Sequence, residues 1–411
     1  MRAADNVSEQ RLNQRLAALA RLGATPAGGV NRPALSLADA QAQELMARWG
    51  QDIGLEPSRD AAGNFFLRLP GGPEGAAPVL SGSHLDSQPT GGRYDGVYGV
   101  VAALEAAQAL LEAGVPRRRP LDVVAWMNEE GSRFAPGMMG SSVFAGARTL
   151  DEIGAVCDSQ GLSVAEALRA TALRLAHIPG RPLGGAVHAY VEAHIEQGPV
   201  LDRAGVPVGI VTGIQGKHTF RIEVDGEAAH AGTSCRAERR DALLAALAMV
   251  RALTEVMHDA EDIVKFTVGR FEVMPNAPSV VPARVVFSID LRHPDTGTLR
   301  RLSAQVQPLC EAHAGPCTVQ VTRLSAADSL VFPPEMQQRV KQAAEALGIP
   351  AIALPSAAGH DARYLHGIAP SAMVFVPSRD GITHNEAEYT DSADLAAGAR
   401  VLTEVLQGLL A

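Results

Sequence analysis

The sequence of 411 residues has few aromatic side chains, few cysteines and no excess of positive charge. Aromatic residues make up 4% of the chain, so alanine, valine and leucine must fill most of the interior. The four cysteines, at 157, 235, 310 and 317, form no Cys-x-x-Cys pair and therefore indicate neither a thiolate zinc site nor a disulfide framework. A net charge of −9 argues against a nucleic acid or an anionic membrane as partner.

Long hydrophobic runs and a secretory leader are also missing. No apolar run approaches the roughly 20 residues of a membrane span. The first residues include Arg2, Asp5, Glu9 and Arg11, where a signal peptide would have an apolar core. We therefore expect a cytoplasmic protein with no membrane partner. The length and a hydrophobic content of 46% allow two domains, each with its own core.

Short apolar runs alternate with helical patterns in the first half of the chain and again near its end. The patterns predict helices over residues 8–22, 36–49, 97–113, 163–175, 334–347 and 392–410, and strands beginning at 65 and 79 and spanning 121–127, 187–195 and 371–376. Such alternation is typical of an α/β fold with a mostly parallel sheet that is covered on both faces.

Between these regions the pattern changes to a different order of elements. It predicts a strand over 219–224, a helix over 241–258, strands over 263–272 and 284–292, a helix over 296–313 and a strand over 318–322. This βαββαβ order is that of the split βαβ sandwich. We therefore expect a first domain, residues 1–215 and 328–411, that is interrupted by an inserted domain over residues 216–327.

Metal-binding residue types gather in the glycine-rich segment from Gly82 to Gly99. The segment connects a predicted strand to a predicted helix, and open α/β sheets bind ligands beyond the carboxyl ends of their strands. It holds His84, Asp86 and Asp95. Nitrogen and oxygen donors without a thiolate suit zinc, manganese or cobalt. The alternative is that His84 and Asp86 only hydrogen-bond a turn.

Three more strand ends carry such side chains. Glu129 and Glu130 follow one strand, His194 and Glu196 lie at the end of another, and His384 follows the last. Taken singly, the glutamates could be a solvated acidic pair and each histidine a satisfied core residue. Four junctions of this kind are better explained by one sheet edge that brings them together. One glutamate could then bind a metal, and its neighbour could act on the metal-bound water.

Four segments together carry a family resemblance: residues 82–96, Asn-Glu-Glu-Gly-Ser-Arg-Phe at 128–134, His-Ile-Glu-Gln-Gly-Pro at 194–199 and Gly-Ile-Thr-His-Asn-Glu at 381–386. They resemble the hydantoinase/carbamoylase branch of the dinuclear metal aminoacylase and carboxypeptidase G-type hydrolases. That branch contains N-carbamoyl-L-amino acid hydrolases, β-ureidopropionases and allantoate amidohydrolases. The resemblance runs from about Val7 to the last helix. It implies a catalytic domain and an inserted domain that serves as lid and dimer interface.

The resemblance also implies a set of functional residues. It implies two divalent metal ions per subunit, which would be zinc, manganese or cobalt. The first would be bound by His84, Asp95 and His194. The second would be bound by Asp95, Glu130 and His384, so that Asp95 bridges the two ions. Glu129 would be the general base, and Asp86 would orient His84. The peptidase relatives commonly carry a carboxylate where this chain has His194, so this histidine favours ureido substrates.

The substrate-binding residues implied by the resemblance are Gln197, His230, Asn276, Arg292, Gly359 and His360. His230 would act on the substrate carbonyl from the other subunit of a homodimer. Arg292 could clamp a free carboxylate of the substrate with two parallel hydrogen bonds. Without the resemblance, Asn276 could be a turn residue and Arg292 a surface charge. Cys235-Arg236 departs from the Pro-Met that relatives commonly have, so we expect the mouth of the pocket near His230 to differ from theirs.

The sequence therefore predicts a metal-dependent amidohydrolase that cleaves the ureido C–N bond of an N-carbamoyl amino acid, a small-molecule substrate. Two metals and a base suit this task, because an amide or ureido carbon resists attack by neutral water. The alternatives within enzymes are an allantoate amidohydrolase and a dipeptidase or N-acyl amino acid hydrolase with the same dinuclear site. A binding protein that had lost turnover would lack one of these groups. A periplasmic solute-binding protein would need an export signal.

Overall fold

The computed structural model describes residues 2–411. The chain divides into two compact units. The first ends at Thr212 and resumes at Phe332, and the second runs from Gly213 to Val331. The sequence placed these boundaries at 215 and 327. Among the described residues, no helix combines the length and apolar character needed to cross a bilayer.

A nine-stranded sheet forms the centre of the first unit. Its strands are β1 (Glu56–Arg59), β2 (Phe65–Leu69), β3 (Val79–His84), β4 (Leu121–Trp126), β5 (Ala189–Ile195), β6 (Val208–Ile214), β14 (Leu330–Val331), β15 (Ala351–Ser356) and β16 (Ser371–Val376). Their order is β1-β2-β4-β3-β5-β16-β6-β14, and β15 also pairs with β6. The four central strands β4, β3, β5 and β16 are parallel, and β1, β2 and β6 pair antiparallel. The predicted α/β fold is confirmed, with its parallel strands at the centre of the sheet.

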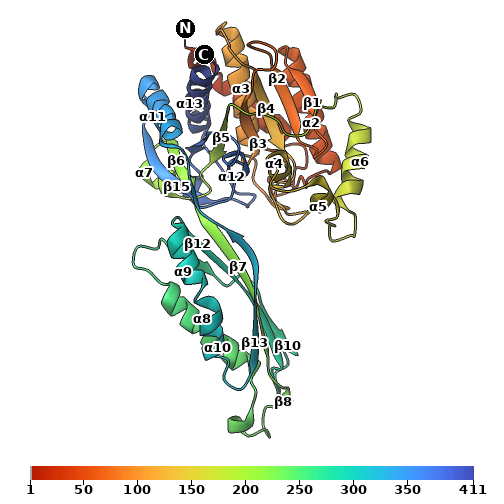
Figure 1. Cartoon of the computed structure of the whole chain (residues 1–411), viewed down its shortest axis with the longest axis vertical. Helices are drawn as coiled ribbons and strands as arrows, with labels where there is room; N and C mark the ends of the chain where they lie inside the picture. Colours follow the sequence, from red (N-terminus) through yellow and green to blue (C-terminus); the bar gives the residue numbers. More distant parts are fainter. Residues whose placement is uncertain (1) are drawn as a thin grey trace. The chain divides into compact units, whose positions relative to one another are not determined.

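Helices and short connections surround this sheet. They are η1 (Ala3–Asn6), α1 (Glu9–Leu19), α2 (Leu37–Asp52), α3 (Val97–Glu112), α4 (Met139–Phe144), α5 (Leu150–Gly154), α6 (Val164–Arg174), α7 (Val200–Ala204), α11 (Pro334–Leu347), α12 (Ala362–Leu365), η3 (Arg379–Gly381) and α13 (Ser392–Leu410). Serine side chains cap two predicted starts, because Ser8 accepts from the Arg11 amide and Ser36 from the Asp39 amide. Figure 1 shows α3 and α13 side by side.

The two faces of the sheet have different chemistry. Along β5, Ala189, Val191, Ala193 and Ile195 join the large apolar core that α1, α3, α11 and α13 complete. The alternate residues Tyr190, Glu192 and His194 point to the opposite face, because successive side chains of a strand alternate. All seven residues of β5 are buried. The strand therefore presents a polar stripe on one face, and the candidate site is built there.

The second unit has the expected βαββαβ order. Its elements are β7 (Gly216–Asp225), β8 (Ala229–His230), η2 (Arg236–Glu238), α8 (Ala242–Met257), β9 (Lys265–Thr267), β10 (Phe271–Met274), β11 (Val280–Val281), β12 (Arg284–His293), α9 (Thr296–Ser303), α10 (Val306–Ala312) and β13 (Thr318–Ala327). The sheet order is β10-β12-β7-β13, with β9 also on β12. Apolar residues of β7, β12, α8, α9 and α10 form a core of its own for this unit.

Two elements of this unit are broken where the sequence predicts continuity. The strand expected over 263–272 is divided into β9 and β10, whose registers on β12 differ by one residue. Between them the Arg270 amide donates to the Ser288 hydroxyl, and the Arg270 carbonyl accepts the Ser288 amide. The helix expected over 296–313 is divided into α9 and α10. Pro308 lies in the first turn of α10 and has no N–H to continue the helical ladder from α9. In the sheet of the first unit, strands β6 and β15 were not predicted from the sequence.

Candidate metal centre

The connection between β3 and α3 positions the first part of the site. His84 is the last residue of β3, and Asp95 stands two residues before α3. Gly96 lies between Asp95 and the helix with a φ of +66°, and a Cβ atom there would come within 2.3 Å of the His84 ring. Only glycine allows this backbone to pass so close to the imidazole. The local fold thus brings Asp95 back over the end of β3.

Two imidazoles point at the same oxygen of Asp95. Asp95 Oδ1 lies 3.8 Å from His84 Nε2 and 3.3 Å from His194 Nε2. Each ring uses its other nitrogen on a backbone carbonyl, His84 Nδ1 on Asp86 O and His194 Nδ1 on Ile195 O, both at 2.9 Å. These contacts orient both rings with Nε2 directed at Asp95, and the Gly96 amide also lies 3.3 Å from His194 Nε2. All three side chains are buried.

A second group forms around the other oxygen of Asp95. His384 Nε2 lies 3.2 Å from Asp95 Oδ2 and 3.4 Å from Glu130 Oε2. His384 is half-exposed, unlike the histidines of the first group, since its side chain keeps 48% of its accessible surface. Both groups have their donor atoms within 4.8 Å of one another. One carboxylate therefore belongs to two sets of three donors, one on each of its oxygens.

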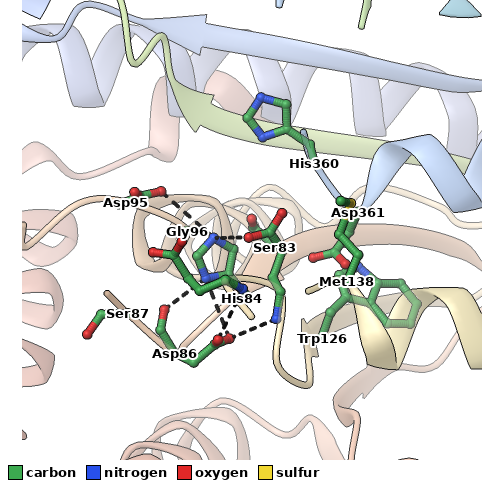
Figure 2. A network of polar contacts seen from close by, with 12 residues as sticks. Ser83, His84, Asp86, Ser87, Asp95, Gly96, Trp126, Met138, His360 and Asp361 are labelled. Carbon is green, nitrogen blue, oxygen red and sulfur yellow. Dashed lines mark hydrogen bonds and ion pairs between the residues drawn. The ribbon is translucent and has the colours of Figure 1, made fainter. Parts of the chain in front are cut away.

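Asp86 fixes the two neighbouring glutamates through their backbone. Its Oδ1 accepts the amide of Glu129 and its Oδ2 accepts the amide of Glu130, both at 3.2 Å. The carboxylate lies 3.7 Å from His84 Nδ1, whereas the backbone carbonyl of Asp86 is within hydrogen-bonding distance. Figure 2 shows His84 between Asp86 and Asp95. Glu129 Oε2 is 3.6 Å from His84 Nε2, so this carboxyl group borders the first donor set.

Burial and neighbouring charges shift the pKa values of the acids and histidines of the site. Burial raises the pKa of Glu130 to about 8, with repulsion from Asp95 adding to it, and burial raises the pKa of Asp86 to about 7. Burial also opposes ionisation of Asp95, but hydrogen bonds from His194 and His384 outweigh it and hold the pKa of that carboxyl well below its usual range. Burial lowers the pKa of His84 to about 4, which keeps the ring neutral. Burial opposes protonation of His194, but the hydrogen bond to Asp95 outweighs it and raises the pKa of that ring to about 9, and a hydrogen bond to the same carboxylate raises the pKa of His384 to about 9. A cation that bound these rings would displace their protons, and the nitrogen and oxygen donors suit zinc, manganese or cobalt.

Two residues that the sequence did not single out hold the ligand positions. Glu388 Oε1 accepts the amides of Tyr94 at 2.9 Å and Asp95 at 3.1 Å, and its Oε2 accepts the Thr383 hydroxyl at 3.1 Å. Gln88 donates its backbone N–H to Glu130 Oε1 at 3.1 Å and its side-chain amide to Oε2 at 2.7 Å. Gln88 lies inside the glycine-rich segment and Glu388 lies two residues beyond the His384 motif. In the sequence, the signal that could have identified these two residues is their nearness to the motif residues.

Gln197, His360 and Gly359 also belong to this face of the sheet. The Gln197 side-chain amide donates to Asp95 Oδ2 at 3.0 Å. His360 is buried with its ring edge-on to His194, at 4.6 Å between centroids, and its Nε2 lies 2.8 Å from Ser356 Oγ. Gly359 faces the side chain of Met138. These three predicted substrate-binding residues are therefore grouped with, or next to, the metal-ligand candidates.

Two other acidic side chains near the site have structural partners. Glu192, His194 and His360 have donor atoms close enough to form a further group. The Glu192 carboxylate, however, already accepts from the Ser83 hydroxyl, the Tyr190 hydroxyl and the Ala362 amide. Glu196 accepts the amides of Val200 and Leu201, both at 2.8 Å, and so caps α7. Both carboxylates hold backbone and neighbouring side chains in place.

The remaining predicted residues lie in the second unit. His230 is exposed, and its Nδ1 accepts the amides of Gly232 at 3.0 Å and Thr233 at 3.2 Å, which leaves the ring proton on Nε2. Asn276 is exposed with a φ of +56°. The Arg292 guanidinium makes two hydrogen bonds to Asp290, at 2.8 and 3.1 Å. His230 thus offers a hydrogen-bond donor, and the two-pronged pair of Arg292 is with Asp290 of its own strand, so binding of a substrate carboxylate by Arg292 stays a prediction.

Comparison with known proteins identifies the family. The model of peptidase family M20/M25/M40 matches residues 80–408. The chain belongs to this family. The match covers every metal-ligand candidate in both donor groups, from His84 to His384.

Relatives that match over nearly the full length show which members of this family the chain is similar to. An N-carbamoyl-L-amino-acid amidohydrolase of Rhizobium meliloti is 37% identical over 96% of this chain and 95% of its own length. An allantoate amidohydrolase of Escherichia coli (strain K12) is 34% identical over 97% of this chain and 98% of its own. The crystal structure of a hydantoinase/carbamoylase family amidase from Burkholderia multivorans is 40% identical, with a TM-score of 0.91 over 98% of both chains. The resemblance read from the four motifs is confirmed.

Proposed function

We propose that this chain is a metal-dependent amidohydrolase that cleaves the ureido C–N bond of an N-carbamoyl amino acid and releases ammonia, carbon dioxide and the amino acid. The observation that carries the proposal is the position of Asp95. Its Oδ1 faces His84 and His194, and its Oδ2 faces His384 close to Glu130. A carboxylate shared in this way is the arrangement that two neighbouring divalent cations require. The names of the near-full-length relatives support the substrate class.

Two divalent cations, held by His84, Asp95 and His194 and by Asp95, Glu130 and His384, would polarise the ureido carbonyl and acidify a water molecule. Zinc, manganese and cobalt all suit these nitrogen and oxygen donors. Without the cations, burial and the neighbouring carboxylates raise the pKa of Glu129 well above its usual range, and two positive charges beside it would favour the ionised form that a base requires.

Glu129 serves as the general base in this mechanism. It takes the proton of the attacking water, and it returns that proton to the departing nitrogen when the C–N bond breaks. The carbamic acid that remains loses carbon dioxide, so one water molecule is consumed for each ammonia and amino acid released. Asp86 keeps Glu129 and Glu130 in place by accepting both of their amides.

The substrate is bound by three residues of the second unit, Arg292, Asn276 and His230. Arg292 binds its free carboxylate, since a guanidinium pairs with a carboxylate through two parallel hydrogen bonds. The exposed Nε2–H of His230 donates to the substrate carbonyl in the partner subunit of a homodimer. Gln197, Gly359 and His360 complete the pocket. We place the reaction in the cytoplasm, as the sequence led us to expect.

The substrate is the least determined part of the proposal. A relative named allantoate amidohydrolase is similar over nearly the full length, which favours allantoate as the second candidate. Measuring ammonia release from N-carbamoyl-L-amino acids and allantoate, and the free amino acid released from N-acetyl amino acids and dipeptides, with zinc, manganese or cobalt added, separates these activities. Ammonia from N-carbamoyl-L-amino acids is the expected result. Release from allantoate alone, or cleavage of dipeptides alone, would refute the proposed substrate.

The roles of the two glutamates are tested separately. Glu129→Gln should keep both cations and lose about 10²–10⁴-fold in kcat, because only the proton transfer is removed. Glu130→Gln should lose the second cation as well as activity. Elemental analysis of the two variants distinguishes them, and a Glu129→Gln variant that had lost metal would show that the assignments are reversed.

The homodimer is tested by complementation. His230→Ala and Glu129→Gln subunits should each be inactive alone. A hybrid dimer contains one site with both groups intact, so mixing the two inactive variants after dissociation should restore part of the activity. An active monomer in sedimentation would contradict this part of the proposal.

A further inference from the structure

The side-chain amide of Gln197 lies among the donors of the second group. Its Nε2 is 3.0 Å from Asp95 Oδ2 and 3.4 Å from His384 Nε2. The Thr383 hydroxyl is also 3.4 Å away. The hydrogen-bearing end of the amide is thus directed at two of the three atoms that would ligate the second cation.

A cation and an amide N–H compete for such atoms. The amide nitrogen lies within 3.4 Å of both Asp95 Oδ2 and His384 Nε2, so a cation bound to these two atoms would lie next to its hydrogen atoms. The positive end of the amide dipole also repels a cation placed beside it. In the first group, by contrast, both histidines already donate their Nδ1 protons to backbone carbonyls, at 2.9 Å. In that group it is a backbone N–H, that of Gly96, which lies close to a donor nitrogen, 3.3 Å from His194 Nε2.

The backbone of Gln197 is anchored, so its side chain is the part that can move. Its N–H donates to Ser378 Oγ at 3.2 Å, and its φ is +59°. Rotation about the side-chain bonds alone would carry the amide away from Asp95. Gln88 provides a useful contrast, because its amide donates to Glu130 Oε2 at 2.7 Å while its backbone N–H holds Oε1. Gln88 therefore orients a carboxylate that keeps further lone pairs available.

We propose that the Gln197 amide is a placeholder for the second cation, and that loading of this cation releases the amide to bind substrate. The inference rests on the proposed function. It makes binding of the second cation depend on the loss of the contacts that the amide makes with Asp95 and His384. Because such coupling is reciprocal, a substrate that engages the released amide must also tighten binding of the second cation.

The test is a titration of metal-free protein with Zn²⁺ or Mn²⁺ against a chromophoric chelator, followed by elemental analysis. Wild-type protein should bind two cations in resolved steps. Gln197→Ala should tighten the second step about two- to tenfold, the equivalent of one ordinary hydrogen bond, and leave the first step unchanged. Gln88→Ala, the matched control, should not tighten it.

Other outcomes overturn the inference in distinguishable ways. An unchanged or weaker second step in Gln197→Ala would show that the amide is a bystander or helps to bind the cation. Equal tightening in Gln88→Ala would show a general loosening of the site. In either case two bound cations in the wild type would leave the proposed function standing, whereas a wild-type chain that bound none would overturn both.

The coupling to substrate is measured in the same titration. In a Glu129→Gln background, which does not turn over, N-carbamoyl-L-alanine should tighten the second step when Gln197 is present. In the Glu129→Gln, Gln197→Ala double variant the compound should have no such effect. Equal tightening in both would refute the release of the amide to substrate.

Discussion

Glu388 offers a sharp test of how the ligand Asp95 is held. The carboxylate is buried, and three donors converge on it: the amides of Tyr94 and Asp95 and the hydroxyl of Thr383. Gly92 lies so close that an added Cβ would come within 2.0 Å of the carboxyl group. Glu388 thus ties the loop that carries Asp95 to the loop that carries His384.

The cost of removing this group follows from the donors it leaves behind. A buried donor without a partner costs about 1–3 kcal/mol, so the two amides alone predict about 2–6 kcal/mol for Glu388→Ala. The Thr383 hydroxyl can turn towards Asp95 Oδ2, 3.5 Å away, and should add little. In Glu388→Gln the remaining oxygen can still accept both amides, and Thr383 can accept from the new NH₂ group. That variant should lose less than about 1.5 kcal/mol.

Both tryptophans, Trp49 and Trp126, lie in the first unit, so urea unfolding followed by tryptophan fluorescence reports on that unit. Metal-free protein should show the full difference between Glu388→Ala and Glu388→Gln. Cation binding should fall about 10–100-fold in Glu388→Ala, as for other groups that support metal ligands. Equal stability of Glu388→Ala and wild type would refute the reasoning, and so would a Glu388→Gln variant as unstable as Glu388→Ala.

Four further predictions concern other parts of the chain. Glu105→Ala removes the buried partner of two arginines of α1 and should cost about 3–5 kcal/mol in urea unfolding. Burial raises the pKa of Asp60 to about 6, although its hydrogen bonds act in the opposite direction. The contribution of Asp60 to the free energy of unfolding is therefore full below about pH 4 and is lost as the pH rises through 6. In unfolding curves, Asp60→Asn should make the free energy of unfolding less dependent on pH between pH 4 and 7. Gly96→Ala should displace the His84 ring and lower metal content by elemental analysis. Arg292→Lys should raise KM for N-carbamoyl amino acids nearly as much as Arg292→Ala, because an ammonium cannot form the two-pronged pair.

The parts of the site that the sequence predicted are those in which chemistry and chain position coincide. His84, Asp95, Glu130, His194 and His384 each stand at or just beyond the end of a buried strand, or just before the following helix. Apolar runs reveal such strands, and parallel neighbours place their carboxyl ends at one edge of the sheet. The two donor groups in the structure contain these five residues. The fold was predictable for the same reason, since burial on both faces makes the central strands continuous apolar runs.

What the sequence could not supply is the set of contacts that depend on where a loop returns. Glu388 accepts the amide of Asp95 from 293 residues away along the chain, and nothing in the residues around it distinguishes this glutamate from a surface acid. The break at Arg270 is similar, because it depends on the pairing with a neighbouring strand. The break near Pro308, by contrast, has a signal in the sequence, the proline itself. Antiparallel β6 pairs with β16, a strand that comes far later in the chain.

Asp86 shows how a correct residue can be given an incomplete role. A carboxylate two residues after a predicted metal-binding histidine suggests a partner for that ring, and the backbone carbonyl of Asp86 does bind His84 Nδ1 at 2.9 Å. The carboxylate itself accepts the amides of Glu129 and Glu130. Through one residue, the end of β3 therefore sets the position of a metal-ligand candidate and of the candidate base that follow β4. Spacing within one segment predicts contacts along the chain, but a contact between two strand ends is visible only when the sheet brings them side by side.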